Sequence, residues 1–127
     1  YFVVDDLVYL KRGGRISAVT AAVGNLLNIK PMISILEDGS LQSVGKIKGS
    51  KRVFSEFVNL MHKHNVNTKD YRIEIMQADC PETGEAFIEV LKKEFGEDIT
   101  YDLQIVGPVI ASHCGPGTLG LIFYGDR

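Results

Sequence analysis

Apolar residues recur at helical spacing in three long stretches of the chain. Ser17 is expected to cap the first helix, which ends at Lys30-Pro31 because proline disfavours a helical residue before it. The second follows Gly49-Ser50, and the third runs from Pro81 to Gly96. Their predicted apolar faces are, in order, Val19, Ala22, Val23, Leu26 and Leu27; Val53, Phe54, Phe57, Val58 and Met61; and Ala86, Phe87, Val90 and Leu91. Each face requires a packing partner, and a β-sheet is the expected one.

A shorter helix is predicted nearer the start of the chain, over residues 7–10. Asp5 or Asp6 can cap it. Gly13-Gly14 ends it, because glycine enters the left-handed conformation at a helix end without steric cost. The first four residues have the pattern of a strand that leads into this helix.

Elsewhere the apolar pattern changes to the period of a strand. Residues 32–36 and 41–47 are expected to form a hairpin around Asp38-Gly39, a tight turn whose two central positions need positive φ. Residues 71–75 and 101–105 form a right-handed crossover unit with the helix between them if they pair in one sheet. Two further strands are predicted at 109–111 and 119–124. The fold class is therefore α/β: a mixed parallel and antiparallel sheet of five to six strands with packed amphipathic helices, forming a single domain over residues 1–127.

Composition narrows the class of protein. Of 127 residues, 45% are hydrophobic and 24% are charged, which is the balance of an ordinary folded domain. Two cysteines make no disulfide framework, and no stretch approaches the roughly 18 apolar residues of a membrane span, so we expect a soluble cytoplasmic protein. The net charge of −2 argues against a nucleic-acid partner, and the basic run at 46–52 is interpreted as a solvated helix start or a protein-docking surface. Because no methionine opens the chain, it is expected to be a fragment.

Two segments have the composition of binding sites. The segment Lys11–Ser17 combines Arg12, Arg15 and a helix N-terminus, an arrangement that can bind an anion; the alternative is a capped helix break with solvated arginines. The segment Ser112–Thr118 is interpreted as a small-residue loop that lets a backbone approach a ligand closely. Its histidine, His113, can donate hydrogen bonds to a carboxylate or phosphate, or it can belong to a structural turn.

Catalytic and metal chemistry receive less support from the residue pattern. His62 and His64 are two residues apart on a predicted helix and point to different sides, so we expect no metal site and no cofactor. Cys114 adjoins His113, but neighbours on an extended segment face opposite ways and exchange a proton poorly. A hydrolase of acyl phosphates or thioesters that uses Cys114 and His113 stays an alternative, as does a protein-interaction module.

Three motifs in order resemble the C-terminal domain of the DegV family, bacterial proteins that bind a long-chain fatty acid and include the acyl-binding subunits of fatty acid kinase. They are Tyr9–Ser17, Leu26–Pro31 and Gly107–Gly117. The resemblance runs nearly end to end. It implies that the fatty acid lies in a tunnel between this domain and an N-terminal fatty-acid-binding domain that this chain lacks.

The resemblance also implies roles for individual residues. His113 helps to hold the fatty acid carboxylate together with hydroxyl residues of the N-terminal domain, and Ser112, Cys114 and Gly115 are its expected neighbours at the lipid. Arg15, with Arg12 and Lys48, is the expected contact for an anion or for the partner proteins, an ATP-dependent fatty acid kinase subunit and an acyltransferase.

The implied role is a non-catalytic one: the protein binds a fatty acid and presents it for acyl phosphate formation, with transient membrane contact and no membrane span. The chain departs from the family pattern at two of these positions. Cys114 stands where threonine is frequent, and Lys48 stands where arginine is common; lysine lacks the bidentate fork of arginine.

Overall fold

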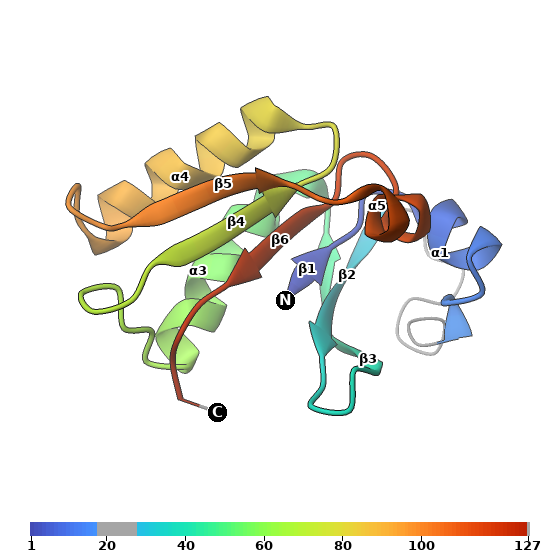
Figure 1. Ribbon diagram of the computed structural model, residues 1–127, viewed down its shortest axis with the longest axis horizontal. Coiled ribbons are helices and arrows are strands. Elements are labelled where there is room, and N and C mark those ends of the chain that lie inside the picture. Colours follow the sequence, from blue (N-terminus) through green and yellow to red (C-terminus); the bar gives the residue numbers. More distant parts are fainter. Residues whose placement is uncertain (18–27, 127) are drawn as a thin grey trace.

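A six-stranded mixed sheet forms the centre of the computed structural model, which describes residues 1–17 and 28–126 (Figure 1). The strands are β1 (Phe2–Val3), β2 (Ile29–Ile35), β3 (Leu41–Lys48), β4 (Ile73–Gln77), β5 (Tyr101–Ile105) and β6 (Leu119–Ile122), arranged in the order β3-β2-β1-β6-β4-β5. β4 and β5 are parallel and joined by a helix, and the other neighbouring strands are antiparallel. The predicted fold class and the predicted crossover unit are confirmed.

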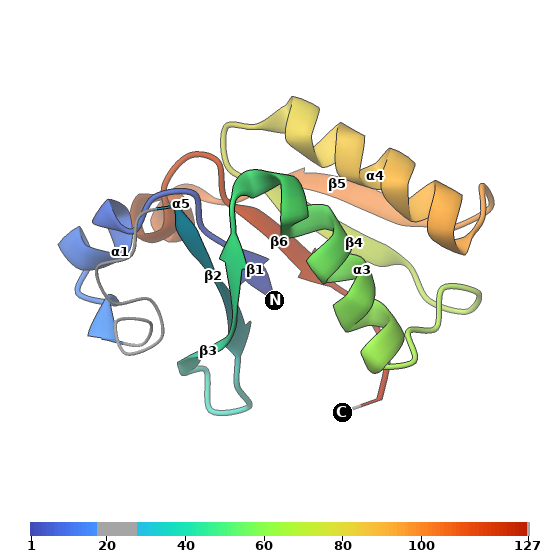
Figure 2. The same ribbon diagram turned by 180° about the vertical axis from the view of Figure 1, so that it is seen from behind.

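Two long helices cover one face of this sheet (Figure 2). They are α3 (Val53–Lys63), which follows a 3₁₀ turn at Ser50–Arg52, and α4 (Pro81–Phe95). Their contacts with the strands form the main core, in which Phe57, Met61, Phe87 and Leu91 are fully buried. The predicted face of α4 was wrong at one position: Ala86 is exposed and Ile88 is buried, because the buried stripe runs through Gly84, Phe87, Ile88 and Leu91. Residues 18–27 of the helix predicted between Ser17 and Lys30-Pro31 lie outside the described residues. Its predicted end was wrong, because Asn28 has a positive φ of 65° and β2 already begins at Ile29.

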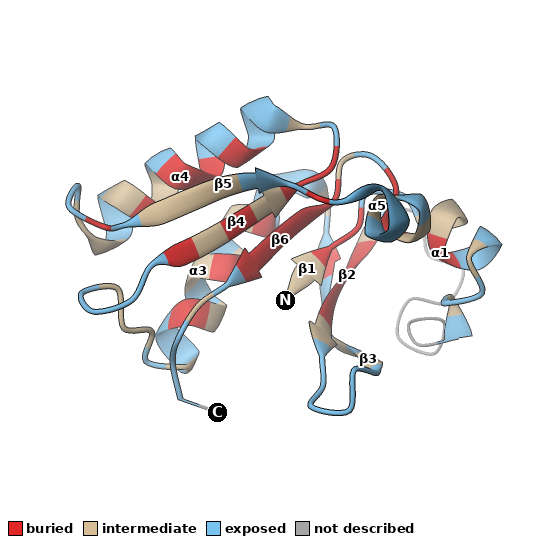
Figure 3. Cartoon of the chain, in the orientation of Figure 1, coloured by how far each residue is buried: buried red, intermediate tan, exposed pale blue. Residues whose placement is uncertain are grey.

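Two short helices, α1 (Val8–Arg12) and α5 (Pro108–Cys114), lie at one end of the sheet (Figure 1). They pack on the face opposite α3 and α4, because successive strand residues point to opposite faces. Val3 and Met32 belong to the main core, whereas the adjacent Phe2 and Ile33 belong to a second cluster. That cluster consists of Val4, Leu10, Ile33 and Cys114, with Phe2, Leu7, Ile16 and Leu41 packed against it. Figure 3 shows the buried residues concentrated on the central strands between these layers.

The hairpin between β2 and β3 is confirmed, but its turn differs from the prediction. Gly39 has φ of 83°, whereas Asp38 is not among the residues with positive φ. The loop is longer than two residues: the Gly39 N–H donates to the Leu36 carbonyl at 2.9 Å, and the Leu36 N–H donates to the Ser40 carbonyl at 2.9 Å. Asp38 instead accepts a hydrogen bond from the Ser40 N–H at 2.9 Å. The turn therefore needs a left-handed conformation at Gly39 and not at Asp38.

The predicted strand at residues 109–111 was wrong, because this segment is the helix α5. Gly107 is extended and Pro108 occupies the first helical turn, where its missing N–H costs nothing. The Ala111 N–H donates to the Gly107 carbonyl at 2.9 Å, which closes that turn. Val109 and Ile110 suggested a strand, yet they are 71% and 58% exposed. Ser112, His113 and Cys114 therefore stand on a helix and not in a loop.

Candidate functional site

α1 and α5 approach each other so closely that two of the sequence motifs meet. Gly13, after α1, lies directly against the imidazole of His113, and a Cβ atom at Gly13 would overlap the ring. Gly115, after α5, lies in the same way against the ring of Tyr9. Both positions favour glycine, because a side chain there would overlap the facing ring and force the ring or the backbone to move. We call this contact region, formed by Tyr9, Gly13, His113 and Gly115, the α1–α5 junction.

His113 occupies the centre of the α1–α5 junction. Its ring is half-buried, and Nδ1 is the one buried side-chain nitrogen or oxygen in the described residues that lacks a hydrogen-bond partner. Gly13 closes over this atom, so Nε2 is the ring nitrogen that can reach a ligand. A neutral ring carries one N–H, and a buried N–H without an acceptor is rare. We therefore assign the neutral ring to the Nε2–H tautomer, which makes His113 a hydrogen-bond donor.

The other three predicted lipid contacts are neighbours of His113, but they have fewer side-chain groups available to bind a ligand. The Ser112 hydroxyl is exposed and donates to the Val109 carbonyl at 2.7 Å. Cys114 is buried in the second cluster, and burial raises the pKa of its thiol, which opposes formation of a nucleophilic thiolate. Gly115 has φ of 83° and ends the helix. Among these four residues, His113 is the one with an uncommitted hydrogen-bond donor on its side chain.

Two of the three predicted anion or partner contacts lie beside the junction. The Arg15 guanidinium is exposed and donates to the Gly13 carbonyl at 2.6 Å. The Arg12 guanidinium lies 5.9 Å from the centroid of the Tyr9 ring. Lys48, in contrast, is exposed at the end of the edge strand β3, opposite Ile29. The structure thus groups Arg12 and Arg15 with His113 and places Lys48 on a different element.

Sequence reasoning missed an ion pair behind the junction. Asp5 does not cap α1, whose Val8 N–H donates to Asp6 Oδ1 at 2.9 Å; Asp5 pairs with the buried Lys30 of β2. Thr118 was also missed: its hydroxyl contacts the Cys114 and Gly115 carbonyls at 3.2 Å and 2.9 Å and fixes the end of α5. The sequence contains no local signal for either contact beyond the polarity of the residues.

The sheet face that carries α1 and α5 is otherwise uncovered by helices of the described segments (Figure 1). Register places Met76, Gly120 and Ile122 on this open face, since their neighbours in β4 and β6 point into the main core. Ile122 is 53% exposed, and Ile35, at the end of β2, is 61% exposed. A cleft of about 660 Å³ lies along these two residues. The open face therefore carries exposed apolar side chains along this cleft.

The far side of the open face, on β4 and β5, is polar. Arg72 bridges Glu74 and Asp102, each at 3.2 Å, and Gln104 donates to Glu74 at 2.9 Å.

Within residues 1–17 and 28–126, no three His, Cys, Asp or Glu side chains are grouped to hold a metal ion. In the same residues, no helix is long and apolar enough to cross a membrane.

The fold and the junction define an α/β domain in which two motifs, about a hundred residues apart, enclose a histidine at one end of a mixed sheet. Residues 1–126 match the model of the DegV family, which is described as a family of uncharacterised proteins. The chain belongs to the DegV family, and the resemblance found in its sequence is confirmed.

Relatives of known sequence and structure agree with this assignment. The chain is 42% identical over 127 residues to a DegV domain-containing protein of Clostridium perfringens, covering 99% of this chain and 43% of that protein. A relative from Clostridium acetobutylicum is 35% identical with the same coverage. The chain thus spans under half the length of these relatives.

Solved structures of fatty-acid-binding members share the fold. A fatty-acid-binding DegV family protein from Thermus thermophilus is 31% identical with a TM-score of 0.75, over 98% of this chain and 44% of that one. A fatty acid binding DegV family protein from Streptococcus agalactiae is 32% identical with a TM-score of 0.76, over 99% and 44%. DegV from Bacillus subtilis, described as a fatty acid binding protein, is 28% identical with a TM-score of 0.76, over 98% and 44%.

Proposed function

We propose that the full-length protein that contains this chain binds a long-chain fatty acid, and that His113 holds the fatty acid carboxylate. The observation that carries this proposal is the α1–α5 junction, which buries Nδ1 of His113 against Gly13 and leaves Nε2 for a ligand. The fatty-acid-binding relatives described above support the choice of ligand.

The carboxylate requires strong donors because it loses water when it binds. A hydrogen bond to an ionised group is shorter and roughly twice as strong as one between neutral groups. The Nε2–H of His113 supplies one such bond. The remaining donors are the hydroxyl groups expected from the N-terminal domain, which completes the site. Nothing in this role requires a nucleophile, and the buried thiol of Cys114 has no part in it.

The acyl chain requires an apolar wall, and the open face of the sheet supplies one. Each buried methylene contributes roughly 0.8 kcal/mol, so a long chain binds tightly only when both sides are enclosed. Ile35 and Ile122 are largely exposed here, which is the condition expected of a wall that lacks its counterpart. We assign the second wall to the N-terminal domain, and relatives more than twice as long as this chain provide the length for it.

The bound carboxylate is then presented to an ATP-dependent fatty acid kinase in the cytoplasm, and an acyltransferase receives the acyl phosphate. Arg12 and Arg15 are the proposed contacts for these partners, since both guanidinium groups are exposed beside His113. Lys48 is a further partner contact on β3.

The proposed function is tested on the full-length protein as purified from cells. Extraction and mass spectrometry are expected to recover about one fatty acid per protein molecule. Incubation with ATP is expected to yield acyl phosphate only when a fatty acid kinase is added. The fragment of residues 1–127 is the matched control, and we expect it to retain far less lipid because one wall is absent.

Two results would contradict the proposal. A full-length protein that carries no lipid and binds none on addition would exclude a fatty acid carrier. Turnover of an acyl phosphate or a thioester by the protein alone, lost in Cys114→Ser, would instead support the hydrolase alternative.

A further inference from the structure

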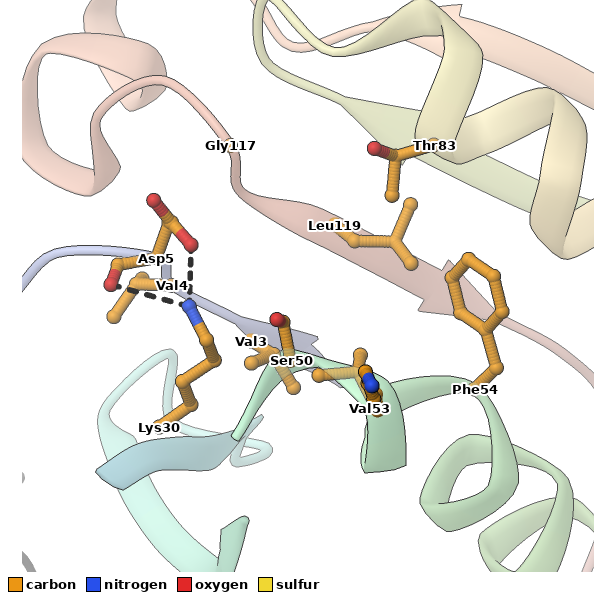
Figure 4. Close-up of a pocket in the computed structure, with 11 residues that line it drawn as sticks. Val3, Val4, Asp5, Lys30, Ser50, Val53, Phe54, Thr83, Gly117 and Leu119 are labelled. Atoms are coloured by element: carbon orange, nitrogen blue, oxygen red, sulfur yellow. Dashed lines mark hydrogen bonds and ion pairs between the residues drawn. The ribbon is translucent and has the colours of Figure 1, made fainter. Parts of the chain in front are cut away.

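A partly buried ion pair joins Lys30 of β2 to Asp5, whose side chain is 57% exposed, just before α1 (Figure 4). Lys30 of β2 is only 9% exposed, and its ammonium bonds to the Asp5 carboxylate and, at 3.4 Å, to the Asp5 main-chain carbonyl. The cavity beside the pair is lined by the apolar Val3, Val4, Val53, Phe54 and Leu119 and by the polar Ser50, Lys51 and Thr83. A buried ammonium needs an anionic partner, so Lys30 holds Asp5 in a defined position.

Asp5 in turn touches the glycine turn that follows α5. A Cβ atom at Gly117 would lie 2.7 Å from Cβ of Asp5 and 3.3 Å from Oδ2. Gly117 has φ of 85°, and its N–H donates to the Ala78 carbonyl at 2.7 Å. The Asp5 carboxylate is therefore placed between the Lys30 ammonium and the turn that carries Gly117.

Asp5 and Gly117 form the first of three contacts between the segment that contains α1 and the segment that contains α5. Residues 5, 9 and 13 of the α1 segment meet residues 117, 115 and 113 of the α5 segment. Residues 9 and 13 are four positions apart and therefore lie on the same side of α1. The α5 segment runs in the opposite direction to the α1 segment, so its contact residues follow in descending order. Asp5 thus makes one of the three contacts that join the α1 segment to the α5 segment, and the last contact in the series is the one on the His113 ring.

We propose that Lys30 and Asp5 are positioning residues for the ligand-binding histidine: their ion pair anchors α1 against α5 and so keeps the imidazole oriented toward the carboxylate. This inference rests on the proposed function. The pair acts through Gly117 and α1, and it makes no contact with the ligand itself. Sites that are held loosely lose affinity even when all their residues are present.

The test uses the full-length protein, with palmitic acid as the probe. Lys30→Met is expected to weaken palmitate binding roughly tenfold, the loss typical of one displaced charge-assisted hydrogen bond. It is also expected to shift the imidazole signals of His113 in an NMR spectrum of histidine-labelled protein. Lys30→Arg is expected to restore most of the affinity and the original signals, because a cavity of about 470 Å³ beside the ammonium can accept the larger guanidinium.

Matched controls separate positioning from general stability. Lys92→Met removes another lysine that pairs with a carboxylate, Glu89 at 3.6 Å, on α4. We expect this variant to leave palmitate affinity and the His113 signals unchanged. Asp5→Asn is expected to reproduce the effect of Lys30→Met, and the double variant is expected to lose no more than either single one, because the two residues act as one unit.

The inference is overturned if Lys30→Met leaves the His113 signals and the affinity unchanged, or if losses in the double variant simply add. It is also overturned if Lys30→Met and Lys30→Arg lose the same affinity with the His113 signals in place. Failure of the proposed function is a separate result: there, His113→Ala binds palmitate as well as the natural protein does.

Discussion

Replacing His113 by alanine in the full-length protein is expected to weaken palmitate binding by about ten- to a hundredfold. A hydrogen bond to a charged group contributes roughly 1.5–3 kcal/mol, and the alanine variant leaves the carboxylate without that donor. The acyl chain keeps its apolar contacts, so binding is weakened and not abolished. Titration calorimetry measures the change directly.

A second histidine provides the control for this prediction. His62, on α3, is exposed and contacts Glu94 at 2.6 Å, on the sheet face opposite the junction. His62→Gln is expected to leave palmitate affinity unchanged. His113→Gln keeps an N–H donor on a shorter, non-aromatic side chain, and we expect its affinity to lie between those of the alanine variant and the natural protein. Equal affinity of His113→Ala and the natural protein would exclude the proposed role of this residue.

Replacing Gly13 by alanine is expected to destabilise the domain by about 1–3 kcal/mol, the typical cost of an extra methyl group in a packed site. Gly13 has φ of −80°, which alanine adopts without strain, so the entire effect comes from the clash with the His113 ring. Gly45→Ala is the matched control, because its added Cβ would meet only Met32, at 3.8 Å. Denaturant unfolding and palmitate titration of both variants test the difference.

The same clash provides an internal check on the contact. In a His113→Ala background the ring is absent, so Gly13→Ala is expected to cost far less stability than it does in the natural protein. A double-mutant cycle measures this coupling between the two positions. An equal cost in both backgrounds would show that the methyl group meets something other than the imidazole.

Most of the fold could be predicted from the sequence because its signals are local. Helical spacing identified α3, the Asp38-Gly39 pair identified the hairpin, and alternation identified β4 and β5. The error at α5 has a physical reason. Val109 and Ile110 favour strands, yet they lie on a seven-residue helix that starts at Pro108, and both side chains are exposed. The helix therefore has no apolar face at helical spacing by which the sequence could have indicated it.

The site was predictable only in its parts. The glycines at 13, 115 and 117 were visible as turn residues, yet their meaning lies in what each one touches across about a hundred residues of sequence. The ion pair of Lys30 with Asp5 depends on the pairing of β1 with β2, which no local pattern specifies. His113 could be singled out by its neighbours, but the burial of Nδ1 and the resulting direction of Nε2 required the structure.

The most direct measurement of the central claim is the position of the fatty acid head group in a crystal structure of the full-length protein with palmitate bound. The account predicts that Nε2 of His113 lies about 2.7–2.9 Å from a carboxylate oxygen, with Nδ1 still against Gly13. A carboxylate bound elsewhere, with the imidazole out of its reach, would contradict it.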